Sequence, residues 1–205
     1  IEDLYSDGPH LGVYNYEIGL PELGAEHTYG LEGSLSYMAD RTELKITSYQ
    51  NYSPNYHLSK VMGSGYEPGA DWIEWGSGSA GWLYIYQMSG LEVYIHGYES
   101  ELGYNPNDII SFNGSFSATR GENLTDNSSL YYMPPDRFLL STEINLLPFS
   151  INLMHKKVFD QNRIGLYESA TSGYETYNLI GTYTMRNSWA IHKICLLYTS
   201  DAADD

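Results

Sequence analysis

The sequence predicts an all-β fold, an antiparallel meander of long strands, and three observations point to it. Apolar and polar residues alternate strictly over several stretches, which is the pattern of a strand whose two faces meet different surroundings. The composition favours strands and turns, since 21 Tyr, 20 Gly and 8 Pro occur in 205 residues. Short and long connections alternate along the chain, as they do in outer-membrane barrels. We therefore expect an open fragment of a large transmembrane β-barrel.

The first predicted hairpin joins a strand at 28–38 to a strand at 43–52 through a tight turn. In the first of these strands Tyr29, Leu31 and Leu35 share one face. A third strand is expected at 82–102 after a long Gly-rich stretch, and twenty residues exceed the usual length of a strand in a soluble protein. Its apolar positions Leu91, Val93 and Ile95 lie on one side, whereas Tyr94 and His96 lie on the other.

The cleanest alternation lies at 110–119, where Phe112 and Phe116 alternate with serines. Further strands are expected at 138–146, 149–153 and 174–185, and an eighth begins at 189–194. This gives about seven complete strands and the start of another. Short turns fall near 39–42, 103–108, 147–148 and 186–188, and longer connections near 57–81, 120–130 and 160–173.

The last eleven residues, 195–205, fit nothing before them and resemble the translation of an adapter used in sequencing libraries. We expect one barrel portion at 1–194 and a non-native tail at 195–205. Without the tail the chain has no cysteine, so disulfides and thiol chemistry are not expected. The formal charge is −16, and removing the three aspartates of the tail leaves −13. Nucleic acid is therefore not an expected partner, because it needs a basic surface.

The apolar residues of the alternating pattern would be stable in contact with lipid. Phe112, Phe116, Leu140 and Ile151 are expected to touch acyl chains from outside a curved wall, while the polar half faces a wet lumen. The lumen face is expected to include Glu32, Glu92 and Glu143. Tyrosines near strand ends are expected to form aromatic girdles at the membrane interfaces; they are Tyr29, Tyr37, Tyr94, Tyr98, Tyr174 and Tyr183.

Several short motifs resemble those of the TonB-dependent outer-membrane receptor family, in order and in spacing. They are Ile1-Glu-Asp-Leu-Tyr-Ser-Asp-Gly-Pro-His10, Tyr16-Glu-Ile-Gly19, Pro21-Glu-Leu23, Glu26, Tyr86-Gln87, Gly90-Leu-Glu92 and Pro134-Pro-Asp-Arg137. The resemblance covers residues 1–194, although the segment between Gln87 and Gly90 is shorter than in many members. It implies a barrel of about 22 strands with a plug in its lumen. Subfamilies that continue with Gly-Pro-His are often assigned to metal or haem uptake.

The resemblance also implies a function, a location and partners. The parent would take up a scarce nutrient, such as a metal chelate, haem or zinc, through the outer membrane of a Gram-negative bacterium. Expected partners are outer-membrane lipid, the plug domain of the same parent chain, the TonB complex through a missing upstream segment, and a small-molecule or metal-chelate ligand. Two alternatives remain open, namely a passive porin-like or small outer-membrane barrel, and a secreted glycan-binding β-sandwich.

No catalytic constellation is visible, so an enzyme is not expected, and neither is a cofactor. The presumed extracellular segments are 7–24, 57–81, 120–130 and 160–173. Within them, His with carboxylates can capture a metal or haem, and Trp can stack on a flat ligand. The spacing fits no fixed metal-ligand pattern, so no metal site is assigned. The candidate ligand-binding residues are His10, Glu17, His57, Asp71, Trp72 and Glu74.

Overall fold

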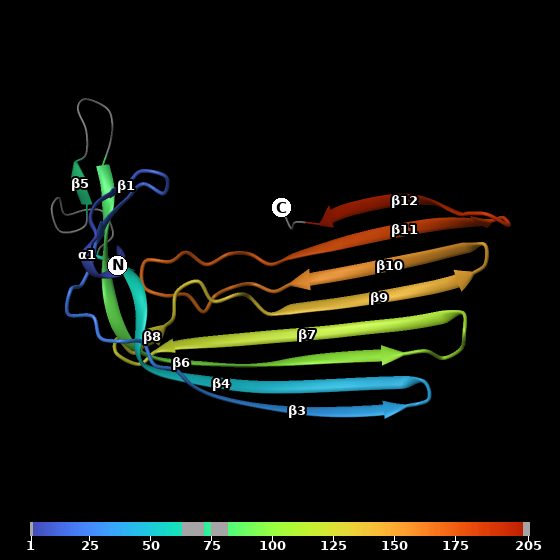
Figure 1. Cartoon of the computed structure of the whole chain (residues 1–205), viewed down its shortest axis with the longest axis horizontal. Coiled ribbons are helices and arrows are strands. Elements are labelled where there is room, and N and C mark those ends of the chain that lie inside the picture. The colour runs from blue at the N-terminus through green and yellow to red at the C-terminus, as the bar shows by residue number, and fades with distance from the viewer. Residues whose placement is uncertain (1, 63–71, 75–81, 203–205) are drawn as a thin grey trace.

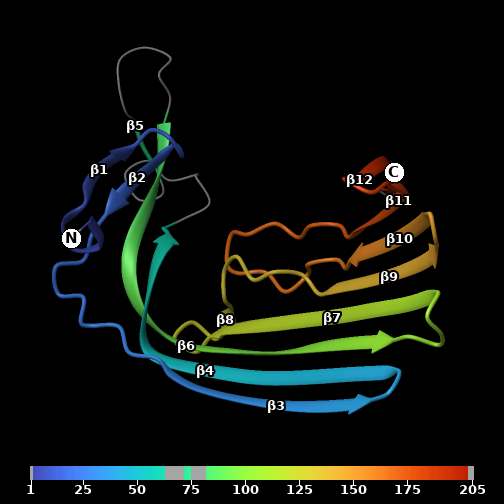
Figure 2. The same ribbon diagram turned by 45° about the vertical axis from the view of Figure 1, so that its right-hand side comes forward.

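Eight long strands pair in chain order and build one open, curved sheet (Figures 1 and 2). The computed structural model describes residues 2–62, 72–74 and 82–202. Every neighbouring pair of long strands is antiparallel, which confirms the predicted meander. The long strands are β3 (Tyr29–Ala39), β4 (Thr42–Val61), β6 (Trp82–Tyr104), β7 (Ile110–Asn123), β9 (Arg137–Leu146), β10 (Phe149–Val158), β11 (Tyr174–Arg186) and β12 (Ile191–Ala202).

Short elements gather where β4 and β6 rise away from the other strands (Figure 1). We call this part the arm: residues 2–26, β5 (Trp72–Glu74), and the ends of β4 and β6 at 56–61 and 82–92. Strand β2 (Asn15–Ile18) pairs with β6 in parallel, so the sheet is mixed. The sequence analysis does not predict the strands before residue 28. The short elements are α1 (Glu2–Tyr5), β1 (Asp7–His10), β2 (Asn15–Ile18), β5 (Trp72–Glu74) and β8 (Ser128–Ser129). In the described part of the chain, no helix is long and apolar enough to cross a membrane.

The register divides the long strands into two chemically different faces. Gly114 pairs with Leu140, and Ile144 pairs with Ile151. Paired residues point to the same side of a sheet, so the predicted apolar residues of successive strands share one face. Serine, asparagine and threonine occupy most of the other face. We call these the apolar face and the polar face.

The apolar face lies open rather than against a second layer. Leu153, in the middle of β10, is 48% exposed, and Leu179 beside it is 43% exposed. The described strands form a single sheet, which excludes the β-sandwich alternative for this part of the chain.

Aromatic side chains mark two levels of the apolar face. Tyr104 stacks on Phe112 beside one short turn, while Tyr29 stacks on Tyr52 at the loop end. Tyr94 and Tyr104 are ten residues apart on β6, which is about 34 Å along a strand and roughly 25 Å in height at the tilt of a barrel strand. That height matches the apolar band of an outer-membrane barrel.

Two residues of the expected girdles lie elsewhere. Tyr98 lies between Tyr94 and Tyr104 on β6, inside the apolar band rather than at either level. Tyr174 pairs with Val158 at the loop end of β11, so it falls on the polar face rather than with Tyr177 and Tyr183. Side chains alternate between the two faces along a strand. Tyr174 stands at an even-numbered position, so its side chain points to the opposite face from those of Tyr177 and Tyr183, which stand at odd-numbered positions.

Several strands run further than predicted, among them β7, which continues to Asn123, and β10, which continues to Val158. Strand β4 continues to Val61 after an irregularity in the register between Ser53 and Tyr56, so residues 57–61 are strand and not loop. Strand β12 continues to Ala202 beside β11 and includes much of the expected tail. Alternation is lost there, because Leu196 and Leu197 are consecutive and both are exposed. The non-native origin of residues 195–205 stays a prediction.

The buried core lies at the loop end of the polar face. Leu91, Val93 and Leu130 form it, with Ile95 and Met133 packed alongside. The apolar residues of β6 therefore do not face lipid at this end, because the chain after β7 folds back over them. This end of the sheet is built like the interior of a water-soluble domain.

A glycine makes this close approach possible. A Cβ atom at Gly121 on β7 would lie 2.5 Å from the Met133 Sδ atom and 2.8 Å from the Leu130 Cβ atom. Only a residue without a side chain lets the returning chain pack directly on the strand.

Candidate ligand-binding site

Two long loops, 124–136 and 159–173, fold together into what we call the loop unit. The Gln161 side-chain amide donates to the Met133 carbonyl at 2.6 Å. The two carboxylate oxygens of Glu168 accept backbone N–H groups from Tyr132 at 3.0 Å and from Gly165 at 2.7 Å. Charge-assisted bonds of this kind are stronger than neutral ones. The two loops thus hold each other in one conformation.

Asp136 ties the loop unit to the sheet. Its carboxylate receives both terminal nitrogens of Arg120 on β7, at 2.5 and 2.8 Å, and Arg163 from the other loop at 3.4 Å. These hydrogen bonds, with that of Arg120 the strongest, lower the pKa of Asp136 below its usual value. The bidentate geometry fixes the direction as well as the position of the loop.

A tight turn organises the other side of the loop unit. The fully buried side chain of Asn123 donates to the Asp126 carboxylate at 2.9 Å and accepts the Asp126 backbone N–H at 3.1 Å. Lys60 of the arm reaches the same carboxylate at 2.6 Å, and this hydrogen bond lowers the pKa of Asp126. The loop unit is therefore joined to the arm across their common edge.

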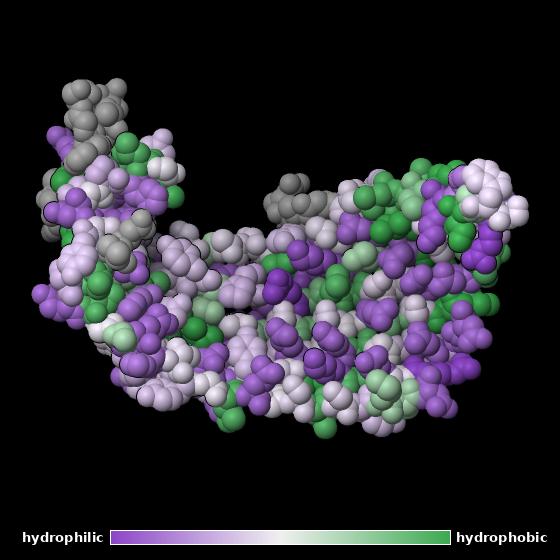
Figure 3. Space-filling model, viewed as in Figure 1, coloured by the Kyte–Doolittle hydropathy of each residue, from purple (hydrophilic) through white to green (hydrophobic). Residues whose placement is uncertain are grey.

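A hollow of about 440 Å³ lies between the arm and the loop unit, and we call it the tyrosine hollow. Burial raises the pKa of Tyr131, so that phenol stays neutral at ordinary pH. Space-filling atoms leave an open notch between the rising arm and the rest of the sheet (Figure 3). The lining residues of the hollow are Val61, Tyr84, Tyr86, Tyr131, Tyr132, Leu166, Tyr167, Glu168 and Ser169.

Some of the predicted ligand-binding residues lie beside this hollow. Glu17 is paired with Tyr86 and Trp72 with Tyr84, on opposite edges of β6 and on the same side of the sheet. His10 contacts Glu17 through Nδ1 and Oε1 at 3.0 Å. The structure thus brings His10, Glu17 and Trp72 to the end of the sheet that carries the two tyrosines.

The other predicted residues are placed differently. The ring of His57 lies against the segment before β3, with its Nε2 atom 2.8 Å from the Gly24 carbonyl and its Nδ1 atom 3.9 Å from Glu26. Glu74 is exposed at the end of β5, and Asp71 lies outside the described residues. Within the described ranges, no three His, Cys, Asp or Glu side chains form a group that could hold a metal ion.

The three glutamates expected in the lumen do not all share a face. Glu32 pairs with Tyr49 and Glu143 with Asn152, both on the polar face. Glu92 precedes Val93 on β6 and lies on the opposite side, where it accepts a hydrogen bond from the Tyr52 hydroxyl at 2.7 Å. Contact of Glu32 and Glu143 with a plug or with lumen water stays a prediction.

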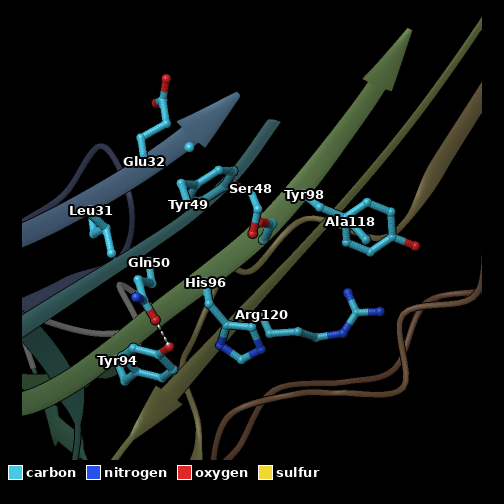
Figure 4. Close-up of a pocket in the computed structure, with 12 residues that line it drawn as sticks. Leu31, Glu32, Ser48, Tyr49, Gln50, Tyr94, His96, Tyr98, Ala118 and Arg120 are labelled. Atoms are coloured by element: carbon cyan, nitrogen blue, oxygen red, sulfur yellow. Dashed lines mark hydrogen bonds between the residues drawn. The ribbon is translucent and has the colours of Figure 1, made fainter. Parts of the chain in front are cut away.

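A second hollow, of about 650 Å³, lies near the loop end of the apolar face (Figure 4). Small residues at Gly33, Ser48 and Ala118 form its floor, because they leave space between larger neighbours. The Tyr94 hydroxyl donates to the Gln50 side-chain oxygen at 2.7 Å, and its ring stacks on His96. Arg120 also lines this hollow, and through its bonds to Asp136 it connects the hollow to the loop unit.

The sequence analysis missed the tyrosines of the hollow. It assigned 120–130 and 160–173 to ligand binding but named no residue there, and it named Tyr86 only as part of a family-like motif. The adjacent pair Tyr131 and Tyr132, followed by Met133 and two prolines, was the available signal. Recognising it needed the knowledge that both loops fold back onto β6.

No protein-family model matches the sequence. Solved structures do match. The copper transporter OprC aligns over 80% of this chain and 24% of its own, with a TM-score of 0.66 and 20% identity. The siderophore receptor PirA from Acinetobacter baumannii aligns over 84% and 27%, with a TM-score of 0.60 and 14% identity. A variant of the ferric enterobactin receptor PfeA from Pseudomonas aeruginosa aligns over 82% and 25%, with a TM-score of 0.53 and 18% identity.

These neighbours are receptors and transporters rather than enzymes, and the receptor family that they represent lies in the Gram-negative outer membrane. The chain spans about a quarter of the length of each. At this level of identity the likeness concerns the fold. The chain has the fold of a segment of a TonB-dependent outer-membrane receptor barrel.

Proposed function

We propose that this chain forms part of the barrel wall and of the ligand-capturing outer rim of a TonB-dependent receptor that takes up a scarce nutrient across the outer membrane. The wall is the run of long strands from β3 to β12. The rim is the arm together with the loop unit. Because such uptake moves a bound molecule without changing its bonds, the chain contributes binding and shape rather than catalysis.

One observation carries the proposal: a single sheet has one apolar and one polar face over the seven long strands from β3 to β11, and its long loops lie at one end only. A sheet with an apolar face exposed over this area would aggregate in water. In hydrocarbon the same face is stable, provided that every strand finds a neighbour. The short turns at the opposite end fit the periplasmic side of such a barrel.

The edges of the sheet support partners within the same receptor. Among the described strands, β3 pairs only with β4, and β12 pairs only with β11. Strands with an unpaired edge cannot face lipid, so further strands must close the wall. A plug would contact the polar face, and TonB would act on that plug. The ligand is proposed to be a small molecule or a metal chelate, with the tyrosine hollow as its first contact.

Labelling in intact cells tests the orientation and the membrane location. In the receptor that carries this chain, with Cys195→Ser, we would place one cysteine in the loop unit (Ser172→Cys) or in an opposite turn (Asn107→Cys). A membrane-impermeant maleimide should label Ser172→Cys in whole cells and Asn107→Cys only after lysis. Equal labelling of both in whole cells would refute the proposed topology.

Uptake itself needs a second assay. Cells that depend on this receptor should accumulate a scarce metal chelate from medium containing nanomolar amounts, and deletion of TonB should abolish the accumulation. Accumulation that continues without TonB would instead support the passive porin-like alternative.

A further inference from the structure

The tyrosine hollow carries a chemical preference that the uptake proposal does not specify. We propose that it selects a ligand of net positive charge with a flat or apolar surface, such as an organic cation, over an anionic chelate. The inference rests on the proposed uptake function and narrows the class of molecule taken up. Three features of the hollow and its surroundings support it.

The first feature is the chemistry of the lining. Five of the nine lining residues are tyrosines, and Glu168 supplies a carboxylate. Among the described residues that line the hollow, none is Lys, Arg or His. The face of an aromatic ring attracts a cation, and it does so more strongly where water is partly excluded. An anion would meet ring faces and a carboxylate, and no cationic side chain of the lining would offset them.

The second feature is the distribution of charge along the chain. No Lys or Arg occurs in residues 1–40 or 61–119. Residues 2–26 of the arm contain Glu2, Asp3, Asp7, Glu17, Glu22 and Glu26. Charges that lie within about 10 Å of a site act on a ligand at ordinary ionic strength. One of these carboxylates, that of Glu17, belongs to the direct strand neighbour of Tyr86.

The third feature is that the nearest cations are bound to carboxylates of the loop unit rather than directed into the hollow. Lys60 lies next to Val61 of the lining, but its ammonium group is 2.6 Å from Asp126. Arg120 and Arg163 of the loop unit both bond Asp136. The basic groups near the hollow therefore hold the loop unit together, and none of them lines the hollow itself.

Paired probes test the preference directly. The receptor carrying this chain would be purified in an uncharged maltoside detergent and titrated with phenyltrimethylammonium or benzenesulfonate. Both probes have one phenyl ring, and they carry opposite charges. The ammonium should bind at least about tenfold more tightly, and its affinity should fall several-fold between 50 and 500 mM NaCl because salt screens the attraction. Equal or tighter binding of the sulfonate, or no binding of either probe, would overturn the inference.

Variants locate the binding. Tyr86→Ala should weaken ammonium binding by about 5- to 30-fold, whereas Tyr86→Phe should keep most of it because the ring remains. Tyr5→Ala is the matched control, since Tyr5 also lies in the arm but is 69% exposed and outside the lining. Heat-dependent gel mobility would report folding of each variant. An equal loss in Tyr5→Ala and Tyr86→Ala would place the binding elsewhere and refute the site.

The two proposals fail in different ways. A receptor that imports an anionic chelate through TonB but shows no preference for the ammonium refutes only the charge preference. A receptor that prefers the ammonium but shows no TonB-dependent uptake refutes only the transport function.

Discussion

The two ends of the sheet are stabilised in different ways. In the strand region between the two girdles, large apolar residues such as Leu153 and Leu179 are half exposed. At the loop end, Val93 and Leu130 are almost fully buried, and ion pairs join loops to strands. The wall therefore depends on the surrounding hydrocarbon, whereas the loop end depends on its own packing in water.

This contrast shows that the same alternation of side chains can stabilise a strand both in hydrocarbon and in water. Along β6, the side that carries polar residues in the wall carries Leu91, Val93 and Ile95 near the loops. Odd-numbered side chains point to the same face along the whole of β6, but that face is covered by the loop unit only near the loops. Each region should consequently respond to a different kind of substitution.

The largest effect is expected in the wall. Leu153→Arg would place a charge on the apolar face, which costs about 2–4 kcal/mol near the middle of a bilayer. Asn152→Arg, one residue away on the polar face, should cost less than about 1 kcal/mol. Urea unfolding of the receptor carrying this chain, folded into lipid vesicles, measures both. Similar losses for the two variants would show that the two faces do not meet different solvents.

A local effect of about 2–3 kcal/mol is expected at the loop end. Leu130→Ala removes a buried side chain from the cluster with Leu91 and Val93 and leaves a cavity. The loss should open residues 124–136 to protease while the strands stay protected. The control is Leu124→Ala, because Leu124 in the same loop is 43% exposed. Uniform cleavage along the whole chain would contradict the separation of the two regions.

The smallest effect concerns pH and the ion pairs of the loop unit. Because Arg120 lowers the pKa of Asp136 in the folded protein, the contribution of this pair is present above about pH 4 and is lost as the pH falls through the lowered pKa. We expect a loss of about 1–2 kcal/mol of local stability below that pH.

A nitroxide label at Ser172→Cys, with Cys195→Ser, should become mobile as the pH falls below about 4. Asp136→Asn should make the label mobile already at pH 7 and remove the pH dependence. Asp108→Asn, in a turn at the opposite end, should leave the transition unchanged. A label whose mobility ignores both pH and Asp136→Asn would show that the ion pair does not hold the loop.

The alternation of side chains was sufficient to predict the eight long strands, but not their ends or the short strands before residue 28. Phe112 and Leu140 can be assigned to one face without a structure, because a strand has a fixed period and successive antiparallel strands keep their pairing. Of the six tyrosines predicted for the girdles, five lie on the apolar face, and Tyr174 lies on the polar face because its position is even-numbered. The charge distribution that supports the ligand preference is also a property of the sequence alone.

Only the tertiary structure decided what covers each face. The contact of Leu130 with Val93, the pairing of β2 with β6, and the meeting of Tyr86 with Tyr131 and Tyr167 join residues far apart in the chain. A local pattern cannot predict such contacts, because they depend on the direction in which each loop leaves its strand. The sequence by itself determined a two-faced wall, and the folding of the loops onto its end determined where a ligand can bind.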